Sequence, residues 1–504
     1  MDPHDARALA HALKDLVKEA HRTIDADRPE PELLRRVKGH LKADLKEIVC
    51  VTESFPAWDH ASLQRGLDAY LAAREPLAEW FGVSGQNRDD DFVNMLMVAQ
   101  EGWQSYDIGA VDYSTVAVGP DETMEVVTLG LVLTFAPDGT PVVFGLRNYD
   151  GGEIPQCRLE VLTASRSAGG AARDEVTRLM REHNVFRGQV LTFGWSEHRG
   201  NQLVTFLPRT EVTADQVVLP DGVLASVERH VAGIGAEAAR LLSHGQHLKR
   251  GLLLHGPPGT GKTHTVRYLM GRMTESTVIV MTGSALRFIS HAAALARQLQ
   301  PAIVVAEDVD LVARDRSYDP EGNPLLFTLL DAMDGVGADA DVTFVLTTNR
   351  AGILERALAE RPGRVDLAVE VPKPDAAGRL ALLRLYAREL TLPDDLDELV
   401  DATEDMTASF FKELLRRAVL RALGERETVT ALEREHLAEA LAEMLDERQA
   451  LTRSLLGGGG STDHDDHDED DDYEDGFEGG PVGPGLAPFP GAVIRSTSQL
   501  MGDS

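Results

Sequence analysis

Apolar residues recur at two different spacings along the chain. Up to residue 85 they fall every three or four positions, as in Leu63, Leu67 and Leu71, and this spacing predicts amphipathic helices. From residue 86 to residue 215, β-branched and apolar runs such as 125–135 predict strands, with one short helix at 176–183. The pattern therefore predicts a helical region, 1–85, followed by a mixed α/β domain, 86–215.

The second half of the chain changes character twice. Residues 216–373 alternate strand-like apolar runs with amphipathic helices, which predicts a parallel sheet in an α/β domain. Residues 374–450 keep only the helical spacing. After four glycines, Gly457–Gly460, the run is rich in Asp, Glu, Pro and Gly, so residues 451–504 are predicted to be a disordered tail.

Composition narrows the class of protein. The 504 residues are enough for about three domains, and a hydrophobic fraction of 43% can fill their cores. The net charge is −32, of which the 12 acidic residues and single arginine of residues 455–504 contribute −11. An acidic surface repels phosphate backbones, which argues against a nucleic-acid binder.

Cysteine content and hydropathy indicate the compartment. Two distant cysteines, Cys50 and Cys157, form no disulfide framework and fit a reducing environment. The N-terminus has no signal-peptide pattern, and no apolar run approaches the ~20 residues of a membrane helix. We expect a cytoplasmic protein without membrane insertion.

A glycine-rich loop carries the strongest chemical signal. It follows the apolar run 251–255 and precedes a predicted helix, and its residues are Gly256, Pro257, Pro258, Gly259, Thr260, Gly261, Lys262 and Thr263. Glycines let successive N–H groups point at phosphates, and the positive end of the following helix faces the same anion. Lys262 is predicted to reach the β- and γ-phosphates, and the Thr263 hydroxyl to ligate Mg²⁺.

Two further strand ends carry candidate catalytic groups. The run 303–306 ends in Glu307-Asp308, where one carboxylate can hold the metal and the other can polarise the attacking water. The run 342–346 leads to Asn349, whose amide can orient that water. Taken alone, the acidic pair can equally be a pair of solvated carboxylates at a strand end.

A Pro-Gly turn carries two arginines, Arg361 and Arg364. Arginines three residues apart are good ligands for anions and poor core residues. Taken alone, the two arginines are more readily explained as solvated surface residues.

Together these motifs resemble the AAA ATPases, in particular the branch with the second region of homology. The resemblance runs from about Val218 to about Asp446 and includes the run 329–336, Thr-Thr-Asn-Arg at 347–350 and Arg-Pro-Gly-Arg at 361–364. It implies ATP and Mg²⁺ as ligands, and a five-stranded parallel sheet of order 5-1-4-3-2 with a helical lid. It also implies a homohexameric ring.

The resemblance assigns roles to individual residues. Arg361 and Arg364 would act as arginine fingers on the nucleotide of the neighbouring subunit, and Asn349 would be the sensor at the fourth strand. Gly233 and Ile234 would lie near the adenine. The stretch Thr407-Ala408-Ser409 matches the part of the lid that closes on the nucleotide, so Ala408 is a candidate contact.

Two features depart from the family pattern. The usual acidic pair is Asp-Glu, whereas here Glu307 precedes Asp308, an order that resembles the mitochondrial AAA translocase of the Rieske protein. The base is then one methylene shorter, and a displacement on the order of 1 Å can lower a rate ~100-fold. The segment between Gly283-Ser284 and Pro301, where the family's aromatic pore loop lies, is shorter here than in most members. The nearest match to that loop is Phe288, which either grips a polypeptide or packs on the core.

These observations favour an ATP-hydrolysing protein that remodels, unfolds or disassembles protein substrates, with residues 1–215 binding the client or adaptor. The Glu307-Asp308 order and the short pore-loop segment motivate an alternative, a slow-turnover ATP-binding switch or scaffold. A nucleic-acid motor is disfavoured by the acidic charge.

Overall fold

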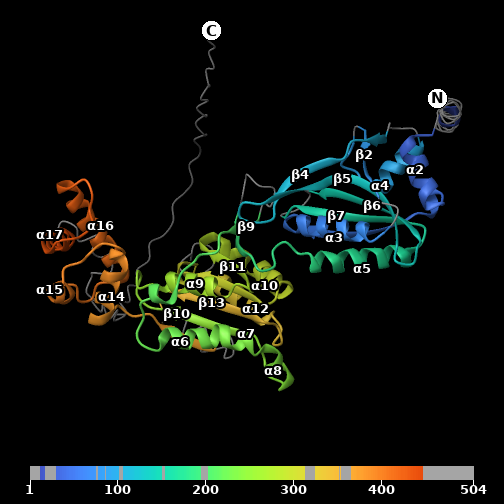
Figure 1. Ribbon diagram of the computed structural model, residues 1–504. Coiled ribbons are helices and arrows are strands. Elements are labelled where there is room, and N and C mark those ends of the chain that lie inside the picture. The colour runs from blue at the N-terminus through green and yellow to red at the C-terminus, as the bar shows by residue number, and fades with distance from the viewer. Residues whose placement is uncertain are drawn as a thin grey trace, which may run out of the picture. The chain divides into compact units, whose positions relative to one another are not determined.

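The computed structural model describes residues 12–16, 30–74, 78–85, 87–101, 106–149, 154–194, 203–312, 324–350, 352 and 365–446 (Figure 1). The predicted tail, 451–504, therefore lies outside the described residues, as do Arg361 and Arg364.

The N-terminal part is an antiparallel sheet with helices packed on both faces. Its strands run in the order β1-β7-β6-β5-β2-β3, with β4 also paired to β5. They are β1 (Val49–Pro56), β2 (Trp80–Ser84), β3 (Asp107–Gly109), β4 (Asp112–Ala117), β5 (Thr123–Phe135), β6 (Pro141–Tyr149) and β7 (Gln156–Thr163). The helices are α2 (Glu32–Leu41), α3 (His60–Ala72), α4 (Phe92–Glu101) and α5 (Arg166–Glu182).

Alternation along the strands explains the two helical layers. On β6, Val142 and Phe144 belong to the core formed with α3 and α5. Their neighbour Val143 points to the other face and belongs to the core formed with α2 and α4. Successive side chains of a strand point to opposite faces, so one strand supplies both cores.

The prediction that residues 1–85 are helical is wrong at β1 and β2, which belong to this sheet. Only Phe55 of β1 is buried, and its other residues are partly or fully exposed, so the strand shows no clear apolar stripe. Helix α5 also begins ten residues before the predicted start at 176, after the N-cap Ser165, whose hydroxyl accepts from the N–H of Ala168. Its first turns contain Gly169 and Gly170, which hide the helical pattern.

The second sheet contains the predicted parallel order. The order β14-β10-β13-β12-β11 is the 5-1-4-3-2 arrangement, and all four pairings are parallel. The strands are β10 (Arg250–His255), β11 (Thr277–Thr282), β12 (Ala302–Glu307), β13 (Val342–Thr348) and β14 (Leu367–Glu370).

Two further strands extend this sheet beyond β11. They are β8 (Val190–Phe193), parallel to β11, and β9 (Val204–Leu207), antiparallel to β8. Both lie within 86–215, the range predicted as a mixed α/β domain, but they pair with the second sheet. The domain limits drawn from the sequence remain predictions.

Helices cover both faces of the second sheet. The helices of this part of the chain are α6 (Val223–Glu228), α7 (Ile234–Ala236), α8 (Ala238–Ser243), α9 (Lys262–Arg272), α10 (Ile289–Gln298), α11 (Val309–Val312) and α12 (Pro324–Asp334), of which α7 and α8 bury no residue. One core joins α10 and α12 to residues such as Val304 and Phe344, and the other joins α9 to residues such as Ile303 and Val345.

The C-terminal helices form the predicted helical unit. They are α14 (Ala376–Ala387), α15 (Asp397–Asp401), α16 (Ala408–Glu425) and α17 (Arg434–Leu445), and they share one apolar core.

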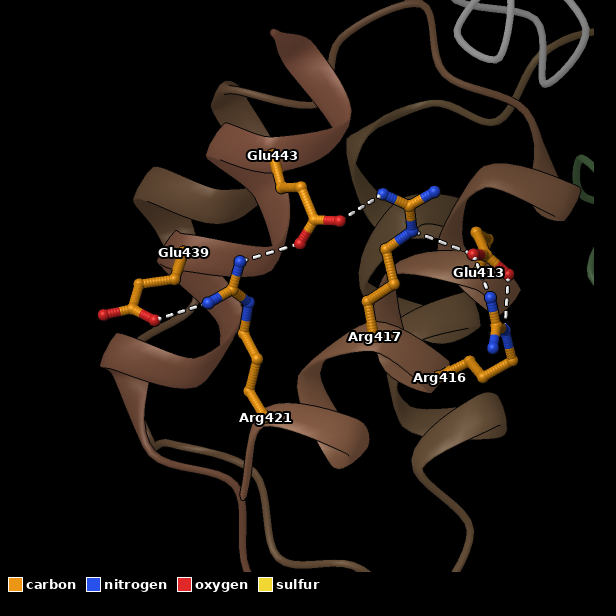
Figure 2. Close-up of polar contacts among 6 residues, drawn as sticks. All are labelled: Glu413, Arg416, Arg417, Arg421, Glu439 and Glu443. Carbon is orange, nitrogen blue, oxygen red and sulfur yellow. Dashed lines mark hydrogen bonds and ion pairs between the residues drawn. The ribbon is translucent and has the colours of Figure 1, made fainter. Parts of the chain in front are cut away.

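Arginines of α16 tie this unit together on its polar side (Figure 2). Arg417 donates to Glu413 at 2.8 Å on its own helix and to Glu443 of α17 at 2.9 Å. Arg421 donates to Glu439 and Glu443 at 2.8 and 2.7 Å. Hydrogen bonds from the neighbouring arginines lower the pKa of Glu413 to about 2. Ion pairs that form a network contribute more to stability than isolated surface pairs do. Because Arg417 and Arg421 both donate to Glu443, the network links α16 to α17.

Within the described part of the chain, we find no helix with both the length and the hydropathy needed to span a bilayer.

Candidate active site

The glycine-rich loop joins β10 to α9, as predicted. Its three glycines have φ angles of 144° (Gly256), 78° (Gly259) and 112° (Gly261), values that side-chain-bearing residues rarely adopt. Helix α9 begins at Lys262, so the positive end of its dipole faces the loop. The loop therefore has the backbone geometry and the helix end of a phosphate site.

Lys262 is held inside this loop. Its side chain is buried, and its Nζ donates to the carbonyl oxygens of Gly256 and Pro257, both at 2.8 Å. Burial lowers the pKa of Lys262, and the carboxylates of Asp308 and Asp310 oppose that effect. The cation thus lies where an anionic ligand of the loop would meet it, with two carboxylates nearby.

Thr263 and Glu307 meet at the same edge of the sheet. Thr263 lies in the first turn of α9 and Glu307 at the end of β12, and the Thr263 hydroxyl is close enough to the Glu307 carboxylate to influence its pKa. Burial raises the pKa of Glu307, while the Thr263 hydroxyl opposes that shift. Oε1 of Glu307 is buried and has no hydrogen-bond partner among the described residues. A hydroxyl and an unsatisfied carboxylate oxygen side by side are a donor set that fits Mg²⁺.

Asp308 and Asn349 are brought together as the sequence predicted. The Asn349 side-chain amide donates to Oδ1 of Asp308 at 3.2 Å, and the Asp308 N–H donates to the Thr347 hydroxyl at 2.9 Å. Asp308 has a φ of 50°, in the left-handed region. The candidate base is therefore held from two sides by the end of β13.

Asp310 is a residue that the sequence analysis missed. Only 4% of it is exposed, and its Oδ1 accepts from the Thr348 hydroxyl and from the Asn349 N–H, both at 3.0 Å. The signal available in the sequence was a third carboxylate close after the Glu307-Asp308 pair. Its partners lie on a strand about 40 residues away, so spacing alone did not reveal them.

A cavity of ≈ 420 Å³ adjoins the loop. Val218, Leu219, Pro220 and Asp221 line it on one side, and Thr260 and Ala408 on another. The presence of Ala408 agrees with its predicted place, whereas the residues from Val218 to Asp221 had not been assigned to the site. A partly apolar cavity beside a phosphate loop suits a nucleoside base.

The lid touches the loop directly. The N–H and the hydroxyl of Ser409 both donate to the carbonyl oxygen of Gly259, at 3.1 and 3.0 Å. Gly233 and Ile234, predicted near the adenine, are not among the residues that line the cavity. They lie where a π-helical turn, Arg229–Gly233, meets α7, and nothing in the described contacts joins them to the loop.

Phe288 packs on the core. It is half-buried against the apolar cluster of α10 and α12, and its ring stacks on that of Phe193 with centroids 6.1 Å apart. Its edge meets His291 at 6.3 Å, and Trp58 contacts both Phe193 and His291. Of the two interpretations left open by the sequence, these contacts favour packing.

Comparison with known proteins identifies the module. Residues 252–373 match the family described as "ATPase family associated with various cellular activities (AAA)". Proteasome-activating nucleotidase 1 of Halobacterium salinarum is 35% identical over 194 residues, which cover 35% of this chain and 47% of that protein. The proteasome-activating nucleotidase of Methanocaldococcus jannaschii is 36% identical over 198 residues, 36% of this chain and 46% of that protein.

A second kind of relative is the ATP-dependent zinc metalloprotease FtsH of Synechococcus sp., 31% identical over 285 residues, 53% of this chain and 43% of that protein. The chain spans less than half the length of these three relatives. The likeness to the mitochondrial translocase finds no support among them. The family match, the phosphate loop and the strand order agree, and the segment 252–373 is similar to the AAA ATPases.

Proposed function

We propose that this chain binds ATP with Mg²⁺ at the edge formed by β10, β12 and β13, hydrolyses it, and uses the energy to remodel, unfold or disassemble proteins. The observation that carries the proposal is the 3.2 Å contact of the Asn349 amide with Asp308, beside Lys262 and the Thr263–Glu307 pair. Its relatives are nucleotidases that activate proteasomes and an ATP-dependent protease.

The chain's own groups divide the work of hydrolysis. Lys262 and the loop N–H groups bind the β- and γ-phosphates, and the N-terminus of α9 adds its dipole. Asp308 takes the proton of the attacking water, and the Asn349 amide holds one carboxylate oxygen so that the other faces the water. Thr263 and Glu307 would hold Mg²⁺, which when bound neutralises part of the charge on the phosphates.

The remaining assignments come from the family resemblance. A homohexamer would let Arg361 and Arg364 reach the nucleotide of the neighbouring subunit and complete its site. Residues 1–215 would bind the client or adaptor. The packing of Phe288 speaks against a grip on clients by that residue, so the client would be engaged elsewhere. We place the protein in the cytoplasm.

One observation favours a second candidate, a slow-turnover ATP-binding switch. The candidate base is an aspartate, and its reach is one methylene shorter than that of glutamate. The nucleotide would then control partner binding by opening or closing the lid. The lid contacts the phosphate loop through the hydrogen bond from Ser409 to Gly259.

Three forms of the full chain test the proposal: the parent, Lys262→Ala and Asp308→Asn. ATP affinity is measured by titration calorimetry, and hydrolysis by release of phosphate. We expect Lys262→Ala to lose ATP binding. Asp308→Asn keeps the size of the side chain and its tolerance of the left-handed backbone, so ATP affinity stays within about threefold while hydrolysis falls at least ~100-fold.

The parent rate separates the two candidate functions. Assembled parent protein that turns over more slowly than ~0.01 s⁻¹, against an enzyme median near ~10 s⁻¹, would support the switch and contradict the ATPase motor. Purification of Asp308→Asn with ATP should also retain the client, because a variant that binds ATP without hydrolysing it cannot complete its cycle.

A further inference from the structure

We infer that Asp310 is a positioning residue for hydrolysis: it sets the end of β13 so that Asn349 meets Asp308. This inference rests on the proposed ATPase function. In the scheme above, Asp310 contacts neither the phosphates nor the attacking water. It acts through Thr348 and Asn349, to which it is hydrogen-bonded.

The Asp310 carboxylate lies between the end of β12 and the end of β13. Asp310 follows β12 in the short helix α11, and its Oδ1 accepts two hydrogen bonds from the end of β13. One donor is the Thr348 hydroxyl and the other is the backbone N–H of Asn349 itself. With only 4% of Asp310 exposed, these bonds are charge-assisted and shielded from water, the setting in which hydrogen bonds hold most firmly.

The two hydrogen bonds of Asp310 fix the direction of the Asn349 side chain. The Asn349 N–H points to Asp310, and the next N–H, that of Arg350, donates to the Thr348 hydroxyl at 3.0 Å. The same hydroxyl donates to Asp310, so Asp310 and Thr348 together determine the backbone on both sides of Asn349. The amide of Asn349 is then directed at Oδ1 of Asp308.

The position of Asp308, the candidate base, depends on the same strand end. The Asp308 side chain is one methylene shorter than a glutamate, and its backbone is in the left-handed region at φ 50°. That conformation persists only where surrounding contacts hold it. Here they are the Thr347 hydroxyl on the N–H and the Asn349 amide on the carboxylate, both from the strand end that Asp310 secures. Loss of Asp310 would therefore displace the base without removing any catalytic group.

A double-mutant cycle tests the inference in the full chain. Asp310→Ala, Asn349→Ala and the double variant are compared with the parent for kcat, for ATP affinity and for thermal midpoint. Because a shift of about 1 Å can lower a rate ~100-fold, we expect Asp310→Ala to lower kcat by ~10- to 100-fold, with ATP affinity within about threefold. We expect the double variant to be no slower than the slower single variant, within about threefold, because both changes remove the same contact.

Two further variants separate positioning from stability. Asp310→Asn keeps an acceptor oxygen at the same place and should restore kcat to within ~10-fold of the parent. Thr343→Val is the matched control on β13, since the Thr343 hydroxyl is buried without a partner among the described residues and its loss removes no hydrogen bond. Its kcat should equal that of the parent.

The outcomes distinguish this inference from the proposed function. A parent that binds ATP but releases no phosphate contradicts the proposed function. If the parent is active but the losses of the two single variants multiply in the double variant, the role of Asp310 is refuted and the proposed function stands. The same holds if both Asp310 variants lose ATP affinity as strongly as they lose kcat. If Asp310→Ala fails to fold, Asp310→Asn decides. A kcat that this substitution lowers by up to ~10-fold in the parent but leaves unchanged in the Asn349→Ala background supports the inference, and the same kcat ratio in both backgrounds refutes it.

Discussion

Replacement of Gly256 by alanine should displace the phosphate loop. A Cβ at this position would lie 2.2 Å from the carbonyl oxygen of Val371 and 3.0 Å from its carbon, whereas ordinary contact begins near 3.4 Å. The loop and the chain after β14 must then move apart by about 1.2 Å. They are held together by a 2.7 Å hydrogen bond from the Val371 N–H to the His255 carbonyl oxygen, so this movement breaks or strains that bond. The φ of 144° adds backbone strain for any residue with a side chain.

The movement can be converted into an affinity. A shift of about 1 Å takes loop N–H groups out of hydrogen-bond range of a phosphate, and each bond to a charged group is worth about 1.5–3 kcal/mol. Loss of two such bonds amounts to about 3–6 kcal/mol, which is at least a ~100-fold weaker binding of ATP.

Titration calorimetry with ATP measures this effect, with Gly233→Ala as the control. Gly233 is helical, with a φ of −64°, and an added Cβ meets nothing within 4 Å. That variant should bind ATP as the parent does and unfold at the same or a slightly higher temperature. ATP affinity within threefold of the parent in Gly256→Ala would refute the tight apposition of loop and Val371. Lost affinity in Gly233→Ala would instead place Gly233 near the adenine, as the family resemblance implies.

Two further predictions concern the oligomer and the N-terminal part. Arg364→Ala should leave ATP binding intact and lower hydrolysis at least ~1,000-fold, as loss of an arginine finger does; hydrolysis at the parental rate would contradict the ring model. Burial raises the pKa of Asp59 to about 7 from 3.8, so the folded state keeps this proton while the unfolded chain releases it. The contribution of Asp59 to stability is therefore fully present below pH 3.8 and is lost as the pH rises from about 4 to about 7, with a loss of about 3 kcal/mol between pH 5 and 8 and almost none above the folded pKa. Urea unfolding of Asp59→Asn should lack this loss, and equal pH dependence in both proteins would show that another group is responsible.

The fold was predictable where the signal is local. Apolar runs such as 303–306 and 342–346 are strands with both faces covered, so their periodicity needs no knowledge of a partner. The edge strand β1 pairs only with β7 and exposes part of most side chains, so its sequence lacks an apolar stripe. Strands β8 and β9 lie in the range predicted as a mixed α/β domain, but their place in the second sheet depends on distant partners that periodicity does not encode.

In the candidate site, too, local features could be predicted from the sequence and contacts between distant segments could not. The phosphate loop is visible in the sequence because its chemistry lies in consecutive backbone groups and in one lysine. The cavity wall at Val218–Asp221 and the bonds of Asp310 arise only when segments tens of residues apart meet at one edge of the sheet. Gly233 and Ile234 were placed near the adenine by the family resemblance alone, and a resemblance in sequence does not show how far two residues lie from each other in this structure.

The acidic pair is where geometry most changes the interpretation of the sequence. Taken as a pattern, Glu307-Asp308 looks like a base that is too short. In the structure, the chain turns at Asp308 with a φ of 50°, and aspartate is among the few residues with a side chain that tolerate this region. Glutamate, with no comparable preference, would strain the turn. The contact with Asn349 reaches the short carboxylate from the neighbouring strand, and Asp310 secures that strand end. The aspartate therefore suits the turn that presents it, and the measured kcat of the parent decides whether that turn also brings it close enough to the water.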